Sequence, residues 1–314
     1  MADPIAREFT VEVRKLRRRF LDQIEPLRPD LFRYCRALCG NVFDAEDLVQ
    51  ESLLKAFSKL SEMHWQVDNP RAWLFRVASN QFIDQQRKHS PTAMPENFDA
   101  PANNAPQLSA EIREALAQLA SRLPAQERVA VLLKDVFDFS LEEIAAQLGT
   151  TSGAVKAALN RGRAKLSQPL PRQAAPVQGE RVPRALLDSF CDAFNKRDFE
   201  RLASLFAEDA VADVVGMVYE VGREQIKKGS LTHTMFDEAG EPSAEARYFA
   251  GEDVIVLWYT VGENKERRVR DVLRFAGTDR QLSLMRYYYF CPETLAEIVG
   301  ALGLPLTPNG YRYS

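Results

Sequence analysis

The stretch 139–166 constrains the fold of this chain more than any other, because it encodes two short helices and the corner between them. Ser140, followed by Glu143 three residues later, forms a capping-box pattern that predicts a helix start. Gly149 can end that helix, since glycine adopts the left-handed C-cap conformation without steric cost. The polar run 150–152 offers the cap of a second helix. This pattern is typical of a helix-turn-helix; an ordinary helical hairpin with a solvated basic face is the alternative.

The net charge of the chain argues against a nucleic-acid binder whose whole surface is basic. The 314 residues include 41 Lys and Arg against 44 Asp and Glu, which leaves a net charge of -3. This length predicts two or three domains, and any nucleic-acid contact must use positive charge gathered on part of the surface. No apolar run approaches the roughly 20 residues of a membrane helix, and the N-terminus lacks a signal-peptide pattern. We therefore expect no membrane partner and a cytoplasmic location.

Cysteine usage predicts neither disulfides nor a metal site. Four cysteines are too few for a disulfide framework in a chain of this length. Cys35 and Cys39 stand close together on a predicted helix, but no histidine lies beside them, which argues against zinc. We expect reduced thiols, no bound metal and no cofactor.

Apolar spacing predicts helices through residues 20–90. Hydrophobic residues recur at intervals of three and four up to Leu38, and Gly40 is placed to end that helix. Asp44 is expected to cap the next helix, where acids crowd the first turn and suit the helix dipole. A further helix is expected after Asn69, with Pro70 in its first turn.

Proline-rich stretches divide the chain into domains. The predicted parts are an N-terminal extension (1–19), a helical domain (20–90), a linker (91–108), a second helical domain that ends in the helix-turn-helix (109–168), a linker (169–183), an α+β domain (184–291) and a C-terminal tail (292–314).

Four motifs follow one another in the order and spacing of a known family. They are DAEDLVQE at 44–51, NPRAWL at 69–74 with Asn80 and Asp84 after it, LPAQE at 123–127, and the helix-turn-helix at 139–166. In these motifs the chain resembles the bacterial RNA polymerase sigma-70 family, extracytoplasmic-function type, over residues 20 to about 168. The resemblance implies two all-α sigma domains, sigma2 and sigma4. It also implies a transcription initiation factor, not an enzyme, that binds core polymerase and directs it to -10 and -35 promoter elements.

The resemblance assigns the acidic helix to polymerase binding, on the coiled coil of the β′ subunit. The implied contacts are Asp44, Asp47, Gln50, Glu51 and Lys55. A solvated helix face is the alternative for these acids.

The resemblance assigns two further surfaces to promoter DNA. The helix 71–88 would melt and read the -10 element, and captured single-stranded bases favour amide and Arg groups. Its implied contacts are Arg76, Asn80, Arg87 and Lys88. The second helix of the helix-turn-helix would enter the -35 major groove, with some side chains at base edges and others on phosphates. The implied base-edge contacts are Thr151, Ser152, Lys156 and Asn160, and the implied phosphate contacts are Arg161, Arg163 and Lys165. The chain departs from the family at 85–86, where Gln replaces the more usual Arg, which predicts a weaker phosphate contact there.

The C-terminal third changes character, with two helices and then strand-like runs up to Phe290. The segments 195–199 and 202–210 resemble the opening of the SnoaL-like, or nuclear-transport-factor-like, family. That resemblance implies a cone of helices against a curved antiparallel sheet, with a pocket between them. The implied pocket residues are His233, Asp237, Trp258 and Tyr288, with Tyr219, Phe236, Tyr259, Arg270 and Asp271 as further candidates.

The pocket leaves several functions open. A small ligand is one partner that it could take, and a satisfied structural histidine is the alternative for His233. No second catalytic group stands at a telling spacing, so we predict no enzyme. By resemblance to sigma factors fused to such domains, residues 184–314 are expected to regulate polymerase engagement. A ligand-sensing DNA-binding regulator and a SnoaL-like enzyme with a vestigial sigma portion are the competing functions.

Overall fold

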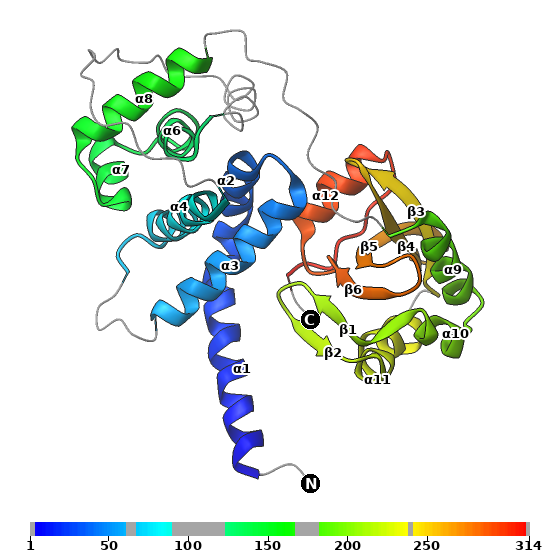
Figure 1. Ribbon diagram of the computed structural model, residues 1–314. Helices are drawn as coiled ribbons and strands as arrows, with labels where there is room; N and C mark the ends of the chain where they lie inside the picture. Colours follow the sequence, from blue (N-terminus) through cyan, green and yellow to red (C-terminus); the bar gives the residue numbers. More distant parts are fainter. Residues whose placement is uncertain (1–3, 61–66, 90–122, 167–181, 238–240, 312–314) are drawn as a thin grey trace. The chain divides into compact units, whose positions relative to one another are not determined.

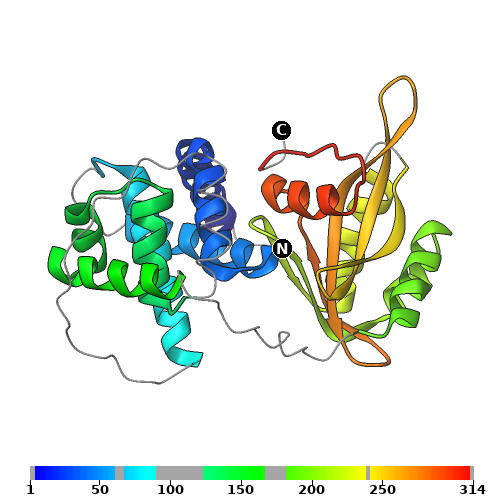
Figure 2. The same ribbon diagram turned by 90° about the horizontal axis from the view of Figure 1, so that it is seen from above.

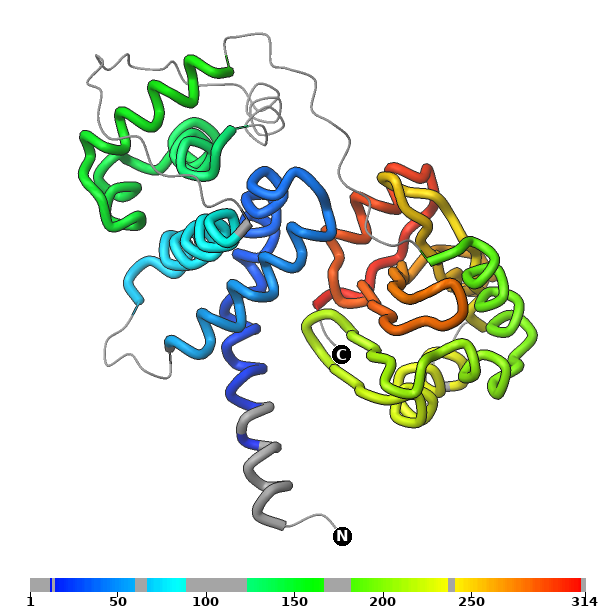
Figure 3. The backbone as a smooth tube through the Cα atoms, viewed as in Figure 1, coloured from blue at the N-terminus to red at the C-terminus, as the bar shows by residue number. Residues whose placement is uncertain are grey.

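The computed structural model describes residues 4–60, 67–89, 123–166, 182–237 and 241–311 (Figure 3). The chain folds as two compact units, Met1–Gln173 and Ala174–Ser314. The predicted linker 91–108, the predicted helix at 109–122 and nearly all of the predicted linker 169–183 lie outside the described residues.

The first part of unit 1 is helical, as predicted. Its elements are α1 (Pro4–Ile24), η1 (Glu25–Leu27), α2 (Arg28–Cys39), α3 (Val42–Leu60) and α4 (Pro70–His89), and α2, α3 and α4 pack together (Figure 1). Gly40 ends α2 in the left-handed conformation, with φ 80°. The predicted cap at Asp44 is wrong: α3 begins two residues earlier, and Asn41 Oδ1 accepts a hydrogen bond from the Asp44 backbone N–H at 2.8 Å.

The second part of unit 1 ends in the predicted helix-turn-helix, formed by α7 (Leu141–Leu148) and α8 (Ser152–Leu166). This part begins with α6 (Ala125–Val131) and a π-helical turn, η2 (Leu132–Val136). The capping box at the start of α7 is confirmed, and Gly149 ends this helix with φ 64°. Thr151 Oγ1 caps α8 by accepting from the Ala154 N–H at 3.1 Å. A Cβ atom on Gly162 would lie 2.8 Å from Val131 Cγ2, so glycine lets α8 cross α6 closely.

Unit 2 is the predicted α+β domain. Its helices are α9 (Arg184–Asn195), α10 (Phe199–Ser204), α11 (Arg223–Ile226), the π-helical turns η3 (Lys227–Leu231) and η4 (His233–Asp237), and α12 (Pro292–Ala301). Its strands are β1 (Phe206–Val214), β2 (Val218–Val221), β3 (Ser243–Phe249), β4 (Glu252–Val261), β5 (Glu266–Gly277) and β6 (Leu282–Tyr287).

The six strands form one sheet in the order β2-β1-β6-β5-β4-β3. The prediction of a wholly antiparallel sheet is wrong for one pair, because β1 and β6 run parallel. Parallel neighbours need a long crossover, and here it consists of all the chain between β1 and β6. The helix α9 covers one face, where Phe190 and Phe194 pack with Leu257 of β4 in the core. Figure 2 shows α12 on the opposite face of the sheet.

The C-terminal tail packs on the sheet of unit 2. Leu295, Ile298 and Val299 of α12 are buried. Beyond the helix, Leu306 forms a parallel bridge with Val269 of β5. The Val269 N–H donates to the Pro305 carbonyl at 2.8 Å. The tail therefore continues the sheet beside β5, beyond the point where β6 ends.

Candidate functional site

The acidic residues of α3 present a polar face, but it is tied to α4. Asp44 and Glu51 are exposed, whereas Asp47, Gln50 and Lys55 are half-buried. Glu51 Oε2 accepts from Gln81 Nε2 at 2.8 Å and from Gln85 Nε2 at 2.7 Å. Lys55 donates to Gln81 Oε1 at 2.9 Å. The two glutamines of α4 therefore hold the side chains at the centre of the predicted polymerase surface.

A buried ion pair lies beneath this face. Glu46 is fully buried, and its Oε1 lies 2.5 Å from Arg28 Nη2, which is itself almost fully buried. Gln50 Nε2 donates to the same oxygen at 2.7 Å. This pair was not predicted, although Glu46 shares the helical spacing of the apolar Val42, Val49 and Leu53. An acidic residue at an apolar position of the helix is the signal from which a buried ion pair could have been predicted.

The predicted -10 contacts form an open surface on α4. Arg76, Arg87 and Lys88 are exposed and Asn80 is half-buried. Arg87 Nη1 lies 3.9 Å from Asp84 Oδ1, so this acid can orient the arginine. The opposite side of α4 carries Phe75 and Phe82 into the core.

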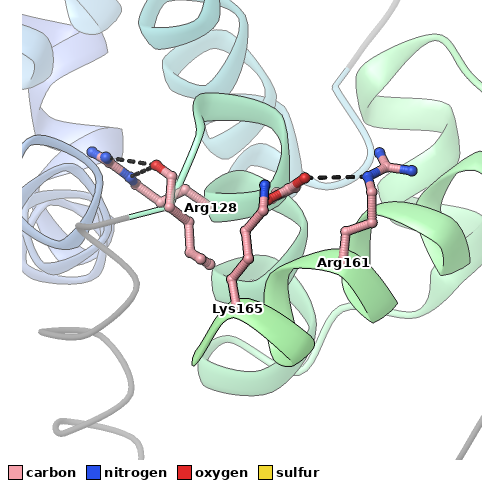
Figure 4. A network of polar contacts seen from close by, with 5 residues as sticks. Arg128, Arg161 and Lys165 are labelled. Carbon is pink, nitrogen blue, oxygen red and sulfur yellow. Dashed lines mark hydrogen bonds and ion pairs between the residues drawn. The ribbon is translucent and has the colours of Figure 1, made fainter. Parts of the chain in front are cut away.

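The predicted -35 contacts fall into two groups on α8. Thr151 at the cap and Lys156 in the first half of the helix are exposed, and Ser152 at the start of the helix and Asn160 near its middle are half-buried. The basic residues of the second half are held in ion pairs instead. Arg161 Nε and Lys165 Nζ lie 3.2 Å and 2.7 Å from the two carboxylate oxygens of Glu127 (Figure 4).

Arg163 is held in the same way by an acid of η2. Its guanidinium pairs with the carboxylate of Asp135, with a shortest N–O distance of 2.5 Å. Hydrogen bonding to Asp135 raises the pKa of Arg163. In this structure the three predicted phosphate contacts therefore connect α8 to α6 and η2. To contact DNA phosphates, Arg161, Arg163 and Lys165 would have to share their charge between the phosphate and the carboxylate, or give up the ion pair.

Sequence periodicity does not predict the junction between α4 and the turn before α7. Phe137 and Phe139 are buried. The Phe137 ring lies 5.4 Å from that of Tyr34 and 5.1 Å from that of Phe75. The guanidinium carbon of Arg71 lies 4.9 Å from the Phe75 ring centroid and 5.1 Å from that of Phe139. Aromatic and cationic groups from the two helical parts of unit 1 thus form one cluster.

Arg128 adds a second contact between the same two parts. Its Nη1 donates to the backbone carbonyl of Leu38, and its Nε and Nη2 donate to the carbonyl of Leu123 (Figure 4). Its guanidinium carbon also lies 5.3 Å from the centroid of Phe82. Burial lowers the pKa of Arg128 to about 10, so it stays charged at neutral pH.

Unit 2 contains a cavity of about 260 Å³ that is lined from both the sheet and the helical turns. The lining residues are Val214, Val218, Glu220, Lys228, Gly229, Ser230, His233, Thr234, Asp271, Tyr287 and Tyr289. Glu220 builds one wall, because its carboxylate accepts from the Ser230 N–H and hydroxyl. Asp271 is buried, with Oδ1 accepting from the backbone N–H groups of Val272 and Tyr288.

Of the four pocket residues first predicted, His233 lines this cavity. Trp258 does not line it. The neighbouring Leu257 and Tyr259 point into the core, so strand alternation turns Trp258 to the other face of the sheet. There its Nε1 donates to Glu245 Oε2 at 2.9 Å. Tyr288 does not line this cavity, although its neighbours Tyr287 and Tyr289 do. The side chain of Asp237 lies outside the described residues.

The further pocket candidates divide in the same way. Asp271 lines the cavity, whereas Tyr219 and Phe236 are largely exposed. Arg270 reaches it indirectly, since its Nη2 donates to the Tyr289 hydroxyl at 2.9 Å and its guanidinium carbon lies 5.0 Å from the ring of Tyr259. Arg270 also donates to Asn309, so it connects a cavity wall to the tail.

The described ranges hold no candidate metal centre and no candidate membrane span. No cluster of three or more His, Cys, Asp or Glu side chains there is arranged to hold a metal ion. The four cysteines form no disulfide with one another in the described ranges, and burial raises the pKa of Cys39 and of Cys191 to about 12. None of the helices described combines the length and apolar character needed to span a bilayer.

Comparison with known proteins identifies each part of the chain. Residues 23–92 match the family Sigma-70 region 2, residues 113–166 match Sigma-70, region 4, and residues 187–282 match the SnoaL-like domain. The crystal structure of the extracytoplasmic function sigma factor SigJ of Mycobacterium tuberculosis aligns with 85% of this chain and 95% of its own, at 20% identity and a TM-score of 0.33.

Two curated relatives are sigma factors. The ECF RNA polymerase sigma factor SigG of Mycobacterium tuberculosis (strain ATCC 25618 / H37Rv) is 29% identical over 223 residues, which are 61% of this chain but only 60% of SigG, so the match leaves two fifths of that relative uncovered. EcfG of Rhodopseudomonas palustris (strain TIE-1) is 34% identical over 154 residues, which are 46% of this chain and 82% of EcfG. The chain therefore belongs to the family of extracytoplasmic-function (ECF) RNA polymerase sigma factors, transcription initiation factors rather than enzymes, and it carries a SnoaL-like domain after its two sigma regions.

Proposed function

We propose that this protein binds core RNA polymerase in the cytoplasm and directs it to promoters with specific -10 and -35 elements. The observation that carries the proposal is the placement of polar side chains on three helices of unit 1. Acids are exposed on α3, arginines are exposed on α4 beside the half-buried amide of Asn80, and hydroxyl and basic groups lie at the start of α8. An acidic chain can in this way select a basic partner with one helix and meet DNA with two others.

The polymerase contact is assigned to the face of α3, on the coiled coil of the β′ subunit. Asp44, Asp47, Gln50, Glu51 and Lys55 belong to that face. Since Glu51 and Lys55 are bonded to glutamines of α4, polymerase binding would also fix the orientation of the -10 helix.

The DNA contacts are assigned to α4 and α8. Arg76, Asn80, Arg87 and Lys88 would capture unstacked bases and phosphates of the -10 element. Thr151, Ser152, Lys156 and Asn160 would reach base edges in the -35 major groove. Arg161, Arg163 and Lys165 would approach phosphates after giving up part of their present ion pairs, so binding should weaken steeply with salt.

Unit 2 is proposed to regulate these activities. A truncation after Ser167 removes all of unit 2 that is described and leaves the helices of unit 1 intact. We expect this truncation to change the yield of run-off transcription with core polymerase, compared with the full-length chain on the same promoter. Equal yields from the two proteins would contradict a regulatory role and leave the sigma-factor proposal standing.

Ligand sensing by unit 2 is a second candidate function, favoured by the cavity. Lys228 lines it, and among the described residues the ammonium of Lys228 makes no ion pair. Tyr287, Tyr289 and Val214 add an aromatic and apolar wall. Such a site suits a small ligand whose ring would lie against the tyrosines. An anionic group on it would have to lie at the exposed Lys228, because the lining also holds the carboxylates of Glu220 and Asp271.

The aromatic sulfonate anilinonaphthalene sulfonate is a suitable probe for this cavity. We expect Lys228→Ala to weaken its binding about fivefold, because one exposed charge pair of ~1 kcal/mol is lost. Fluorescence titration of the full chain measures this, and Lys265→Ala, an exposed lysine of the β4–β5 turn, is the matched control. Equal affinities for the two variants would argue against a ligand in the cavity.

A further inference from the structure

The helix α1 carries the densest run of positive charge in the chain. Five of the six residues 14–19 are Lys or Arg, although the whole chain has a net charge of -3. The run precedes residue 23, where the match to Sigma-70 region 2 begins, so the family match does not account for it. Like charges at helical spacing repel one another, and such a run therefore favours a partner of opposite charge.

Three cations of this run form one exposed face. Lys15, Arg18 and Arg19 are spaced by three and four residues, which places them on the same side of a helix, and all three are exposed. The other side of α1 packs into unit 1, where Phe20 and Ile24 are 6% and 5% exposed. We call Lys15, Arg18 and Arg19 the basic face of α1.

Little of the charge on this face is neutralised by neighbouring acids. Lys15 Nζ lies 2.7 Å from Glu12 Oε1, but both side chains are well exposed, so the pair is weak. Among the residues that the structure describes, Arg18 and Arg19 take part in no ion pair. The exposed Asp22 lies one turn after Arg18 and lowers the local positive potential only in part. Unlike the basic residues in the second half of α8, these arginines need not give up a carboxylate before they bind an anion.

The chemistry of the basic face favours phosphate over the other available partners. The polymerase surface proposed for the acids of α3 is basic and would repel this face. A lipid surface requires an apolar helix face that inserts, and in this part of α1 that face is already buried in unit 1. Duplex DNA carries one negative charge per about 1.7 Å of its axis and binds Arg and Lys without any requirement for base sequence. The basic face therefore matches the DNA backbone best.

Contacts within unit 1 bring the buried end of α1 close to the proposed -10 surface. The ring centroids of Phe20 in α1 and Phe57 in α3 lie 5.4 Å apart. Two residues before Phe57, Lys55 donates to Gln81 of α4 at 2.9 Å, and Gln81 adjoins Asn80 in the chain. Since packed helices lie about 10 Å apart, this end of α1 lies within about 20 Å of α4. A duplex presents about 12 phosphates over that length, so DNA engaged by α4 has phosphates within reach of α1.

We propose that the basic face of α1 binds the phosphate backbone of duplex DNA next to the -10 element, in a contact that does not depend on base sequence. This contact holds the duplex beside α4 while α4 captures unstacked bases. It rests on the proposed promoter function for the position of the duplex, whereas the attraction between the basic face and DNA is a property of the free chain.

Two variants of the full-length chain with opposite expected effects test this contact. The probe is a fluorescein-labelled DNA duplex of about 20 base pairs and arbitrary sequence, and its anisotropy at several salt concentrations gives the affinity and the salt dependence. We expect Arg18→Ala, Arg19→Ala to weaken binding about fivefold or more and to reduce the slope of log K against log salt by about 1.8, because two phosphate contacts are lost. Asp22→Asn removes a negative charge beside the basic face and should tighten binding about twofold.

Lys265→Ala, Arg280→Ala is the matched control, because it removes two exposed positive charges from unit 2. An equal loss of affinity in this control, an unchanged salt slope in the α1 double variant, or weaker binding by Asp22→Asn would overturn the contact. The same holds if a single-stranded RNA of equal length binds more tightly than the duplex and loses that affinity in the α1 double variant, since the basic face would then be an RNA site.

Affinity for core polymerase, measured on the same variants, separates this contact from the function proposed above. The basic face is not part of the α3 face, so we expect all variants to bind the core enzyme equally well. A chain that binds no core polymerase but gives the expected duplex results would refute the promoter function and leave the α1 contact standing. Normal polymerase binding with unaltered duplex binding would refute the α1 contact alone.

Discussion

The double variant Asp47→Asn, Glu51→Lys is expected to bind core RNA polymerase at least about 30-fold more weakly than the unmodified chain. Glu51 is exposed at the centre of the α3 face, and Gln81 and Gln85 hold its carboxylate in one orientation. A pre-oriented acid loses little side-chain entropy on binding a basic partner. Disrupting one such close charge pair typically costs about 2 kcal/mol or more, which corresponds to the 30-fold change. Fluorescence anisotropy with labelled protein and purified core enzyme measures it.

Glu142→Lys provides the matched control for this experiment. Glu142 is an exposed acid on α7 of the same unit, and its reversal changes the net charge by the same amount as Glu51→Lys. We expect it to leave the affinity within about threefold, because exposed charges away from an interface contribute little. Holoenzyme assembly that survives the double variant would remove α3 from the polymerase interface.

Replacing Glu46 by Ala is expected to lower the free energy of unfolding by about 3–5 kcal/mol. The substitution leaves the Arg28 guanidinium almost fully buried without its carboxylate partner, and it takes an acceptor from Gln50. An uncompensated buried charge is among the most destabilising defects in a helical core. Urea denaturation followed by far-UV circular dichroism measures the loss on the truncation after Ser167, provided that this fragment unfolds in a single transition, and otherwise on the full chain.

The double substitution Arg28→Met, Glu46→Leu separates charge burial from lost packing. We expect it to be clearly more stable than Glu46→Ala alone, because two apolar side chains of similar size leave no unpaired charge. Glu12→Ala is the surface control, since its pair with Lys15 is well exposed and should contribute less than about 1 kcal/mol. A loss below about 1 kcal/mol in Glu46→Ala would mean that water reaches Arg28.

Local signals were sufficient for the helix-turn-helix. The capping box of Ser140 and Glu143 and the left-handed Gly149 act between neighbouring residues, so their geometry follows from spacing alone. The same holds for Pro70 in the first turn of α4. The cap of α3 was misassigned because Asn41 and Asp44 are both good capping residues and only the chain direction after Gly40 selects between them.

Long-range partners could not be predicted in this way. Nothing local indicates that Phe137 meets Tyr34, or that Arg161 and Lys165 share one buried glutamate. The parallel pairing of β1 with β6 depends on where the whole intervening chain crosses, and a strand pattern does not record that path. The orientation of Trp258 away from the cavity could have been predicted, because it follows from strand alternation once the neighbouring residues are known to face the core.

The sequence by itself determined the type and order of the helices and strands, and it determined the family, because capping, periodicity and motif spacing are short-range properties. Only the tertiary structure decided which charged side chains are available and which are already paired. It also decided that the two helical parts of unit 1 meet through Phe137 and Phe139. Burial and pairing depend on atoms brought together from distant positions, and their electrostatic and packing energies exist only once the chain has closed on itself.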